Sequence, residues 1–507
     1  MKHIVRSTLI LAVFFSIDKG LALLRQLIIA RQFKLSPELD AFNAANNVPD
    51  LLYALISGGA LAIAFIPVLT QYVEQKGRKD AWDLFSRIAN LTFLVTAGLS
   101  VVVALLAGPL VRSQVGVAPG FGPSQQALVA DLMRLNLIAT LIFSISGLVM
   151  ASLQANQHFL LPAMAPALYN LGQIVGALIL APSAGYRLGP VTLPAFGFGI
   201  QGLVYGVILG ACLHLAIQIP GLVRYRFHWT PAINFHHPGV LQVLSLMGPR
   251  LVTMFFIQLI FLARDNLASR LGTGPVSALT YGWFIMQVPE TLIGTALATV
   301  LLPTLAEQIT RGQREAFRQT LNSALRVILA FSLPAAALLA VAIRPLVRIL
   351  NFDAAGTELV VWATRAYLAG ILGYSMLEVS SRAFYAQQNA RTPLLTSVFR
   401  ILAFIVLGTL FFRPLGAPGI ALADSLAITG EALIQLFLLN RQEPEVVKVS
   451  STLGRVILVA GTGALLVYAL MRIAPLPELP LAIGALALAG LAALPFLWPE
   501  VKLIIKL

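Results

Sequence analysis

The sequence predicts an all-α integral membrane protein with about 14 transmembrane helices, arranged as two parallel six-helix repeats followed by two further helices. Three observations support this fold class. Hydrophobic residues fill 58% of the 507 positions and charged residues only 11%, whereas soluble proteins carry about 25% charged residues. Apolar runs of about 20 residues, long enough to cross a bilayer, recur along nearly the whole chain. These runs are continuous, which excludes the alternating strands of a membrane β-barrel.

The first apolar run is interpreted as a retained span. Lys2 and Arg6 precede it as in a signal peptide, but the run continues past Leu27 and no small-residue cleavage site follows. The predicted spans lie near residues 6–30, 41–72, 84–108, 128–154, 160–181, 197–223, 239–270, 276–306, 318–343, 358–385, 393–412, 417–440, 453–473 and 480–499.

The charge distribution predicts how these spans are oriented. The chain has 35 basic and 21 acidic residues, a net charge of +14. Basic residues favour alternate loops by roughly two to one, and the positive-inside rule places such loops in the cytoplasm. Both termini are therefore predicted to be cytoplasmic. Because orientation accounts for the basic excess, no nucleic-acid partner is predicted.

Internal repeats organise the chain. Pro109 follows Pro67 by 42 residues, and Pro345 follows Pro303 by the same distance. A second set of matches, at a constant offset of 217, pairs Gly202, Gln218 and Arg224 with Gly419, Gln435 and Arg441. Spans 1–6 and 7–12 therefore look like two copies of one unit. Since six is an even number, the two copies have the same orientation in the membrane.

The repeats predict three domains: residues 1–226 with spans 1–6, residues 227–441 with spans 7–12, and residues 442–507 with two additional spans. Two lobes of this kind predict alternating access around a central cavity, with the substrate bound near the middle of the membrane. Since a fold alone does not define a function, the cavity residues must carry the specificity.

Several enzymatic motifs are absent from the sequence. No lysine follows a glycine, so a P-loop and its ATP hydrolysis are excluded. There is no His-Glu-x-x-His motif, and His228, His236 and His237 are interpreted as a solvated loop cluster, with metal binding as the alternative. We therefore predict a protein that is not an enzyme and that has no cofactor and no metal.

Ionisable residues inside the apolar spans are the main functional signal, because each costs about 2.5–3.5 kcal/mol at the centre of a lipid-facing helix. Together they predict a hydrated, net cationic cavity that suits an anionic phosphate headgroup, with Lys19, Arg25 and Arg250 exposed to it. Structural ion pairs and snorkelling to the interface are the alternatives. Asn170 and Gln173 are interpreted as packing residues. The intramembrane charges are Asp18, Lys19, Arg25, Asp40, Asp50, Arg250, Arg264, Asp265, Glu290, Arg365, Glu378, Arg382, Arg400, Asp424 and Glu431.

A signature in the first hairpin carries a family resemblance. It comprises Asp-Lys-Gly-Leu-Ala-Leu-Leu-Arg-Gln from Asp18 to Gln26, followed by Ala-Arg-Gln-Phe at 30–33, Leu-Asp-Ala-Phe at 39–42 and Val-Pro-Asp-Leu-Leu at 48–52. The signature resembles the MurJ/MviN family, the lipid II flippases of the multidrug/oligosaccharidyl-lipid/polysaccharide exporter superfamily. Leu-Leu-Pro-Thr-Leu at 301–305 and Phe-Tyr-Ala-Gln-Gln at 384–388 extend the resemblance over essentially the whole chain.

The resemblance implies a V-shaped fold of two lobes, a groove for the lipid tail along the last two spans, and outward translocation of an undecaprenyl-pyrophosphate-linked peptidoglycan precursor. Lys19 stands at a basic family position, Arg25 at an essential arginine and Asp40 at a functional aspartate. The predicted substrate-binding residues are Lys19, Arg25, Asp40, Arg250, Arg264 and Asp265. The predicted coupling or structural charges are Asp18, Glu378, Asp424 and Glu431.

The chain departs from the family pattern at several cavity positions. Tyr53 and Phe284 stand where the family usually has arginines of the pyrophosphate site. Without these arginines, either the binding site is rewired or the substrate differs. All the departures that bear on the cavity are Gln26, Tyr53, Gly58, Trp283, Phe284 and Gln287.

The predicted function is a lipid II flippase of the bacterial cytoplasmic membrane, acting in peptidoglycan biosynthesis. Its predicted partners are a lipid-linked glycan and membrane lipids, and a monomer is favoured. A flippase for lipid-linked polysaccharide units is the first alternative. An ion-coupled drug exporter and a non-transporting relative are the others.

Overall fold

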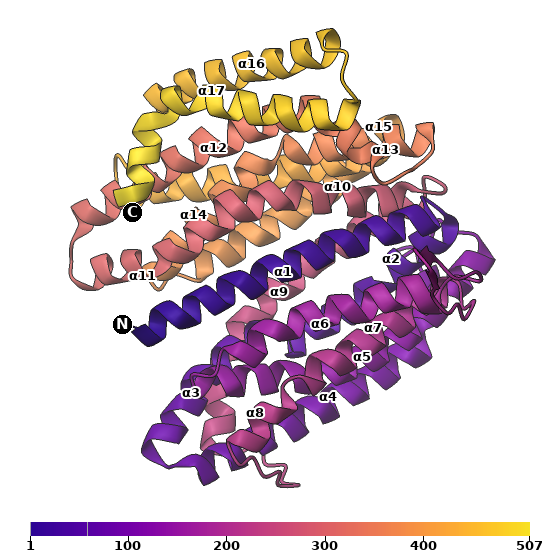
Figure 1. Ribbon diagram of the computed structural model, residues 1–507. Coiled ribbons are helices and arrows are strands. Elements are labelled where there is room, and N and C mark those ends of the chain that lie inside the picture. Colours follow the sequence, from indigo (N-terminus) through magenta and orange to yellow (C-terminus); the bar gives the residue numbers. More distant parts are fainter. Residues whose placement is uncertain (1, 58, 507) are drawn as a thin grey trace. The chain divides into compact units, whose positions relative to one another are not determined.

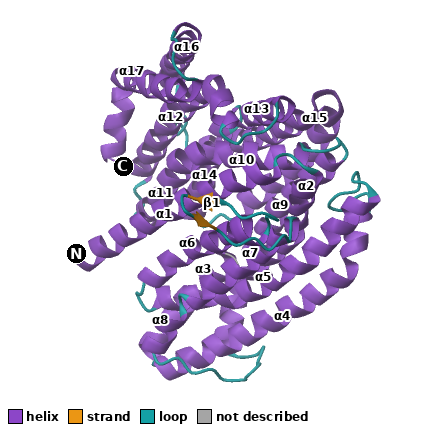
Figure 2. Cartoon of the chain, turned by 45° about the vertical axis from the view of Figure 1, so that its right-hand side comes forward, coloured by secondary structure: helices purple, strands orange, loops and turns teal. Residues whose placement is uncertain are grey.

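The computed structural model describes residues 2–57 and 59–506. It describes side chains at all of these positions except 2–12, 57, 59, 60, 62, 63, 188, 191, 249, 250 and 504–506. Helices make up most of the described residues, and two short strands form one hairpin (Figure 2). The chain divides into two compact units, Met1–Arg270 and Leu271–Leu507.

The first unit is a bundle in which α4, α5, α6 and α7 lie side by side (Figure 1). Its elements are α1 (Lys2–Phe33), α2 (Pro37–Leu52), the π-helical segment η1 (Tyr53–Ser57), α3 (Gly59–Gln75), α4 (Arg78–Arg112), α5 (Pro123–Ala155), α6 (Leu160–Val175), the π-helical segment η2 (Gly176–Leu180), β1 (Arg187–Leu188), β2 (Val191–Thr192), α7 (Ile200–Ala216), α8 (Ile219–Arg224) and α9 (Pro238–Ser269).

The second unit is also a helical bundle, with a core in which α12 packs against α11, α13 and α14. Its elements are α10 (Pro275–Glu290), the π-helical segment η3 (Thr291–Thr295), α11 (Ala296–Thr310), α12 (Arg314–Arg348), α13 (Ala354–Leu368), α14 (Ile371–Ala386), α15 (Arg391–Gln442), α16 (Ser450–Ile473) and α17 (Glu478–Lys506).

The predicted fold class is confirmed, because every predicted span falls on a helical segment. Among the described residues, 10 helical segments are long and apolar enough to cross a membrane. One of them, α15, covers two predicted spans and breaks between them at Gly416, where the backbone leaves the helical region. The remaining predicted spans correspond to α1, to α2–η1–α3, and to α13 with α14. The chain is therefore a multi-pass membrane protein.

The two repeats are visible in the order and length of the helices. α1 and α9 each have 32 residues, and α4 and α12 each have 35. Between them, α2–η1–α3 and α10–η3–α11 both consist of a helix, a five-residue π segment and a second helix. Gly199 and Gly416, at the predicted offset of 217, share a backbone conformation that is essentially restricted to glycine. Their φ and ψ angles are 55° and −134°, and 64° and −146°, respectively.

One side-chain contact recurs in both repeats. Arg134 Nε on α5 donates to the carbonyl of Ala104 on α4 at 3.0 Å. Arg365 Nε on α13 donates to the carbonyl of Ala340 on α12 at 2.8 Å. In each repeat an arginine thus donates to a carbonyl of the preceding helix, from α5 to α4 and from α13 to α12. Two parallel copies of one unit are expected to share such a contact.

The helix α9 opens the second repeat but belongs to the first compact unit. It packs on α2, α3 and α4, so contacts divide the chain after Arg270. The predicted domain boundaries at 226 and 441 mark the sequence repeats instead, and they stay a prediction. A repeat and a compact unit are different divisions, because a helix can pack away from the copy to which its sequence belongs.

The two additional spans, α16 and α17, pack along α12 and against each other (Figure 1). Glu500 on α17 is fully buried and accepts from Arg326 of α12 at 2.9 Å and from Arg455 of α16 at 2.5 Å. A buried carboxylate is tolerated when it is paired in this way. One side chain therefore ties three helices of the second unit together.

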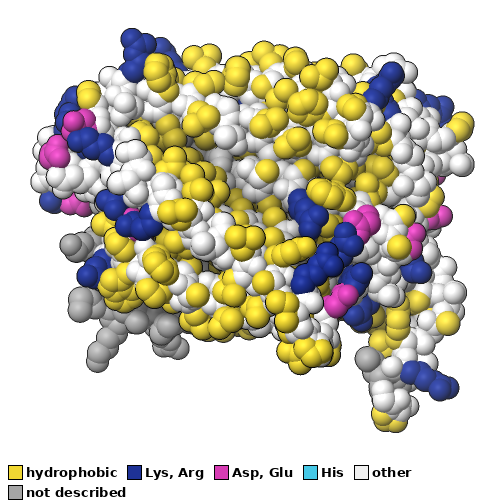
Figure 3. All heavy atoms as spheres, turned by 90° about the horizontal axis from the view of Figure 1, so that it is seen from above, with side chains coloured by type: hydrophobic (Ala, Val, Ile, Leu, Met, Phe, Trp, Pro, Cys, Tyr) yellow, Lys and Arg dark blue, Asp and Glu magenta, His cyan; other side chains and the backbone are white. Residues whose placement is uncertain are grey.

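Apolar side chains cover much of the surface of the protein. Figure 3 shows one face on which hydrophobic side chains are widespread and Lys and Arg gather in patches. On α4, Leu94, Val101 and Leu105 are 53%, 59% and 74% exposed. Large exposed apolar areas are rare on soluble monomers and typical of surfaces that face lipid.

Candidate functional site

Arg25 and Asp18 on α1 share one partner on α6. Arg25 Nη1 donates to Asn170 Oδ1 at 2.9 Å, and Asn170 Nδ2 donates to Asp18 Oδ1 at 2.8 Å. Residues seven apart lie almost above one another on a helix of 3.6 residues per turn, so one amide fits between the two charges. Asn170 is buried, whereas Arg25 and Asp18 are half-buried. A neutral amide therefore orients the guanidinium.

The other predicted residues of the first hairpin differ in exposure. Lys19 is exposed, and its ammonium lies 5.2 Å from the centroid of the Phe15 ring. Asp40 is fully buried in the first turn of α2, which Ser36 caps by accepting from the backbone N–H of Leu39 at 3.2 Å. Arg250 lies on α9, but its side chain is outside the described part of the structure.

Arg264 and Asp265 form a buried pair where α9 packs on α2. Arg264 Nε donates to Asp265 Oδ1 at 2.8 Å, and Asn47 Nδ2 of α2 donates to Asp265 Oδ2 at 2.7 Å. Both carboxylate oxygens of Asp265 therefore have a donor inside the first unit. The contact joins α9 to α2, as a structural ion pair would, and the substrate-binding role of Arg264 and Asp265 stays a prediction.

An aromatic row in the first unit ends at Tyr169, the residue that precedes Asn170 in the sequence. The Tyr53 ring lies 5.3 Å from that of Phe143, and the Phe143 ring lies 5.1 Å from that of Tyr169, both edge to face. Tyr53 is one of the positions at which we predict a departure from the family pattern. The row therefore presents aromatic ring faces and phenol hydroxyls, and not a second guanidinium group. Gly58, another departure, lies outside the described residues.

The second unit carries a related aromatic group and several paired charges. Trp283 on α10 packs edge to face against Tyr374 and Tyr367, with ring centroids 5.1 Å and 5.5 Å apart. Glu378 forms an ion pair with Arg382, one turn along α14. The predicted coupling charges in this unit thus have polar partners, and their role in coupling stays a prediction. The partners of Asp424 and Glu431 are Arg400, Tyr374 and Thr396.

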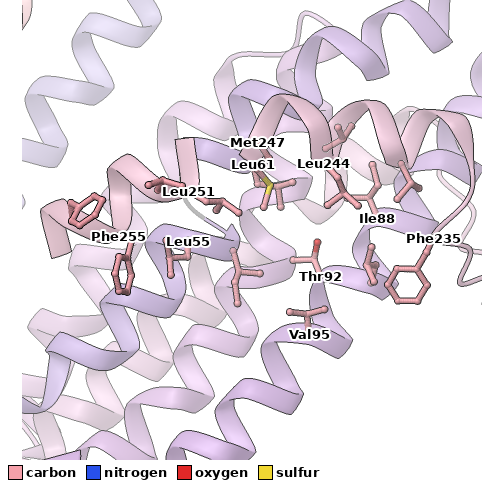
Figure 4. A pocket seen from close by; sticks show the side chains of 16 residues that line it. Leu55, Leu61, Ile88, Thr92, Val95, Phe235, Leu244, Met247, Leu251 and Phe255 are labelled. Carbon is pink, nitrogen blue, oxygen red and sulfur yellow. The ribbon is translucent and has the colours of Figure 1, made fainter. Parts of the chain in front are cut away.

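An apolar cavity of about 560 Å³ lies in the first unit between η1 with α3, α4 and α9. Figure 4 shows Leu55, Val95, Met247 and Phe255 pointing into it from these elements. Its lining is hydrophobic except for Thr92. The cavity has room for a hydrocarbon chain but lacks the charges and donors that a buried pyrophosphate needs.

Sequence reasoning missed the uncharged side chains that bind the predicted charged residues. The sequence pattern favours a packing role for Asn170, yet this residue contacts both Arg25 and Asp18 of α1. The presence of an amide side chain in an otherwise apolar span is the sequence signal that could have indicated this role of Asn170. Among the residues whose side chains the structure describes, no three His, Cys, Asp or Glu side chains gather as a metal-binding group.

Two six-helix repeats with charged residues inside the membrane-spanning helices are typical of one class of protein, the secondary transporters. Solved structures agree with this class at the level of the fold. A lipid II flippase MurJ in an inward closed conformation superposes with a TM-score of 0.79 and 20% identity, over 97% of this chain and 100% of that one. An inward-facing multidrug transporter of the multidrug/oligosaccharidyl-lipid/polysaccharide superfamily superposes with a TM-score of 0.69 and 15% identity. The match covers 87% of this chain and 99% of that one.

Sequence comparison assigns the family within this class. The family model for the lipid II flippase MurJ matches residues 29–477, and the chain belongs to this family. The lipid II flippase MurJ of Burkholderia cenocepacia is 29% identical over 431 residues, 83% of this chain and 81% of the relative. The probable lipid II flippase MurJ of Vibrio cholerae is 26% identical over 452 residues, 87% of this chain and 83% of the relative.

Proposed function

We propose that this chain is a lipid II flippase of the bacterial cytoplasmic membrane, which carries an undecaprenyl-pyrophosphate-linked peptidoglycan precursor outward. It works by alternating access, as a transporter and not as an enzyme, with both termini in the cytoplasm. Family membership over residues 29–477 and the fold shared with a MurJ structure at a TM-score of 0.79 support the proposal. Two parallel six-helix repeats are the usual basis of alternating access.

The observation that carries the proposal is the way Arg25 is held. Its guanidinium is half-buried on a membrane-spanning helix and is oriented by the neutral amide of Asn170. Arginine binds phosphate through two parallel charge-assisted hydrogen bonds, and orientation lowers the cost of forming them. Because Tyr53 and Phe284 replace two arginines of the usual site, Arg25 carries a larger share of pyrophosphate binding than in relatives that keep them.

A complementation experiment tests this role of Arg25. We expect wild-type protein to support growth of a bacterium depleted of its own MurJ, and Arg25→Ala to abolish that support while accumulating normally in the membrane. A hydrogen bond to a charged group contributes about 1.5–3 kcal/mol, so transport should fall by roughly 10- to 100-fold. Arg25→Lys should keep part of the function, since lysine keeps the positive charge but cannot form the two parallel hydrogen bonds of a guanidinium group.

A matched control comes from a second arginine in the same unit. Arg134 bonds to Asp131 and to the carbonyl of Ala104, away from the Arg25–Asn170 contact. Arg134→Ala should therefore complement at similar membrane levels. Full complementation by Arg25→Ala would exclude the proposed binding of pyrophosphate by Arg25.

A flippase for lipid-linked polysaccharide units is the second candidate function. Tyr53, which packs on Phe143, favours it, because the family resemblance implies an arginine at the position of Tyr53 in peptidoglycan flippases. Loss of surface polysaccharide after depletion of the chain, with no accumulation of lipid II, would select this candidate. Accumulated lipid II followed by lysis would select the first.

A further inference from the structure

A buried charge cluster joins the two halves of α15 to α14. Arg400 Nη2 donates to Asp424 Oδ1 at 3.1 Å, and the Tyr374 hydroxyl donates to Asp424 Oδ2 at 2.7 Å. Arg400 is 9% exposed and Asp424 is 4% exposed. Both oxygens of Asp424 therefore accept a hydrogen bond, one of them from a cation. Hydrogen bonds that involve a charged donor are the stronger ones, so Asp424 is the better-bonded acid of the cluster.

Glu431 lies seven residues further along the same helix and accepts fewer hydrogen bonds than Asp424. It is 3% exposed, and its Oε1 accepts from the Thr396 hydroxyl at 3.1 Å. That hydroxyl has a single proton, and its oxygen also lies within 3.1 Å of the Pro393 carbonyl. Gln435 Nε2 donates to Thr396 Oγ1 at 2.8 Å and holds the hydroxyl in place. Glu431 thus shares its hydrogen-bond donor with a second acceptor.

The groups that face this cluster from neighbouring helices add no second cation among the described residues. α14 contributes Tyr374, α13 contributes Tyr367, and α10 contributes Trp283, which packs on both tyrosines. The Arg382 guanidinium of α14 is paired with Glu378. Arg400 also acts electrostatically on Glu431 through space.

The net charge of the cluster indicates that the two acids differ in protonation. With both carboxyls ionised, Arg400, Asp424 and Glu431 carry a net charge of −1 within a membrane-spanning bundle. An excess charge of this kind is costly, and a buried group escapes the cost by becoming neutral. Asp424 holds the cation and the phenol, so Glu431 is the acid that becomes neutral. We propose that Glu431 is a proton-binding site whose occupancy is set by the competition of two carboxylates for Arg400.

The local hydrogen bonds accommodate both states of this site. When Glu431 is ionised, the Thr396 hydroxyl donates to it. When Glu431 takes a proton from water onto a carboxylate oxygen, the Thr396 hydroxyl is released to donate to the Pro393 carbonyl. Only the O–H bond of the acid forms or breaks, and the proton returns to water on release. Any movement that brings Arg400 toward Glu431 and away from Asp424 expels the proton.

The first repeat has a titratable group at the corresponding position. The offset of 217 that relates Gln218 to Gln435 also relates His214 to Glu431. His214 Nδ1 lies 2.6 Å from the Ser146 hydroxyl and 3.2 Å from Gln218 Nε2. A neutral imidazole satisfies these contacts without a counter-ion. Both repeats therefore bury a proton-accepting side chain at this point, and only the second couples it to an ion pair in the described part of the chain.

Infrared spectroscopy of the purified full chain in lipid nanodiscs tests the proposal independently of transport. We expect the wild-type protein to show at neutral pH the carbonyl band of a protonated carboxylic acid, identified by its shift in heavy water. Glu431→Gln should lose the intensity of one acid. Asp424→Asn should lose the same intensity although Glu431 is present, because Arg400 then pairs with Glu431 and ionises it.

Glu500 provides the matched control, since it is a fully buried glutamate in the same unit. Arg326 and Arg455 both pair with it, and Glu500→Gln should leave the band unchanged. Monodisperse elution of each variant shows that it is folded. A band of undiminished intensity in Glu431→Gln, or in Asp424→Asn, would overturn the proposal.

Discussion

At the scale of single residues, Asn170 determines how the charges of α1 are presented. Its amide accepts from Arg25 and donates to Asp18, so one neutral side chain fixes the position of both. A carboxylate in its place would fix the guanidinium equally well but would cancel its charge. A neutral bridge orients the guanidinium of Arg25 without adding a negative charge beside it.

The neutral amide of Asn170 leads to a prediction for an isosteric change at this residue. Asn170→Asp places a carboxylate 2.9 Å from the guanidinium and beside Asp18, and it should reduce transport by roughly tenfold or more, in line with the roughly 1.5–3 kcal/mol of a charged hydrogen bond. The measurement is complementation of a MurJ-depleted strain at matched protein levels. Asn170→Gln keeps a neutral amide and serves as the control. Equal activity of the aspartate variant and the wild type would show that the amide is not needed.

His237 provides a prediction about pH. Its Nδ1 accepts from the backbone N–H of Gly239 at 3.2 Å and caps the N-terminus of α9. Burial lowers the pKa of His237, and the nearby positive charges of Arg87 and Lys76 lower it further. A protonated imidazole cannot accept this hydrogen bond, and it would also carry a positive charge at the positive end of the helix dipole.

The sign of the effect follows from the lowered pKa. The unfolded chain binds the proton more readily, so the stabilisation is complete above the unfolded pKa of about 6.5 and is lost as the pH falls from there through the lowered pKa of the folded state. Thermal unfolding should therefore occur at a lower temperature at mildly acidic pH. His237→Asn keeps a good cap without titration and should remove this part of the pH dependence. An unchanged pH profile in this variant would assign the effect to other groups.

How far the sequence predicts single residues depends on how local the contact is. The charges of the spans are visible because a charge in an apolar run stands out by itself. The role of Asn170 is not visible, because 145 residues separate it from Arg25 and 152 from Asp18. The contact between Asp265 and Asn47 is hidden for the same reason, since it depends on α9 packing on α2.

At the scale of elements, Gly416 determines where one span ends and the next begins. Helical backbone geometry continues from the start of α15 to its end except at this residue, whose φ is 64° and ψ is −146°. The sequence predicts a break between residues 412 and 417, where Pro414, Gly416 and Pro418 cluster. The π segments η1 and η3 are not predictable, because an extra residue in a helical turn leaves no mark on hydrophobic periodicity.

Backbone strain at Gly416 leads to a stability prediction. A methyl group placed on this residue would meet only Pro418 Cδ, at 4.0 Å, so space is not the obstacle, but the backbone conformation is. Gly416→Ala should destabilise the second unit by about 1–3 kcal/mol, measured as a lower unfolding temperature of the purified protein. Gly454→Ala, in a regular helix with nothing within 4 Å, should be neutral or stabilising. Equal stability of the two variants would contradict the assigned role.

At the scale of the whole molecule, the repeat explains why so much of the fold is readable from the sequence. Corresponding helices of equal length, such as α4 and α12 with 35 residues each, follow from two copies of one unit. The packing of α9 with the first unit is not readable, because repeat matches report ancestry and not contact. The substrate depends on a few side chains, and the predicted departures from the family pattern at Tyr53 and Phe284 bear on it.

The most direct test of the account is translocation of labelled lipid II by purified protein in liposomes. The MurJ of Burkholderia cenocepacia, 29% identical to this chain, is the matched positive control. We expect the wild-type chain to move lipid II across the bilayer and Arg25→Ala to lose this activity while remaining folded and inserted. Failure of the inserted wild-type chain to translocate lipid II, under conditions in which the control protein does so, would contradict the proposed function.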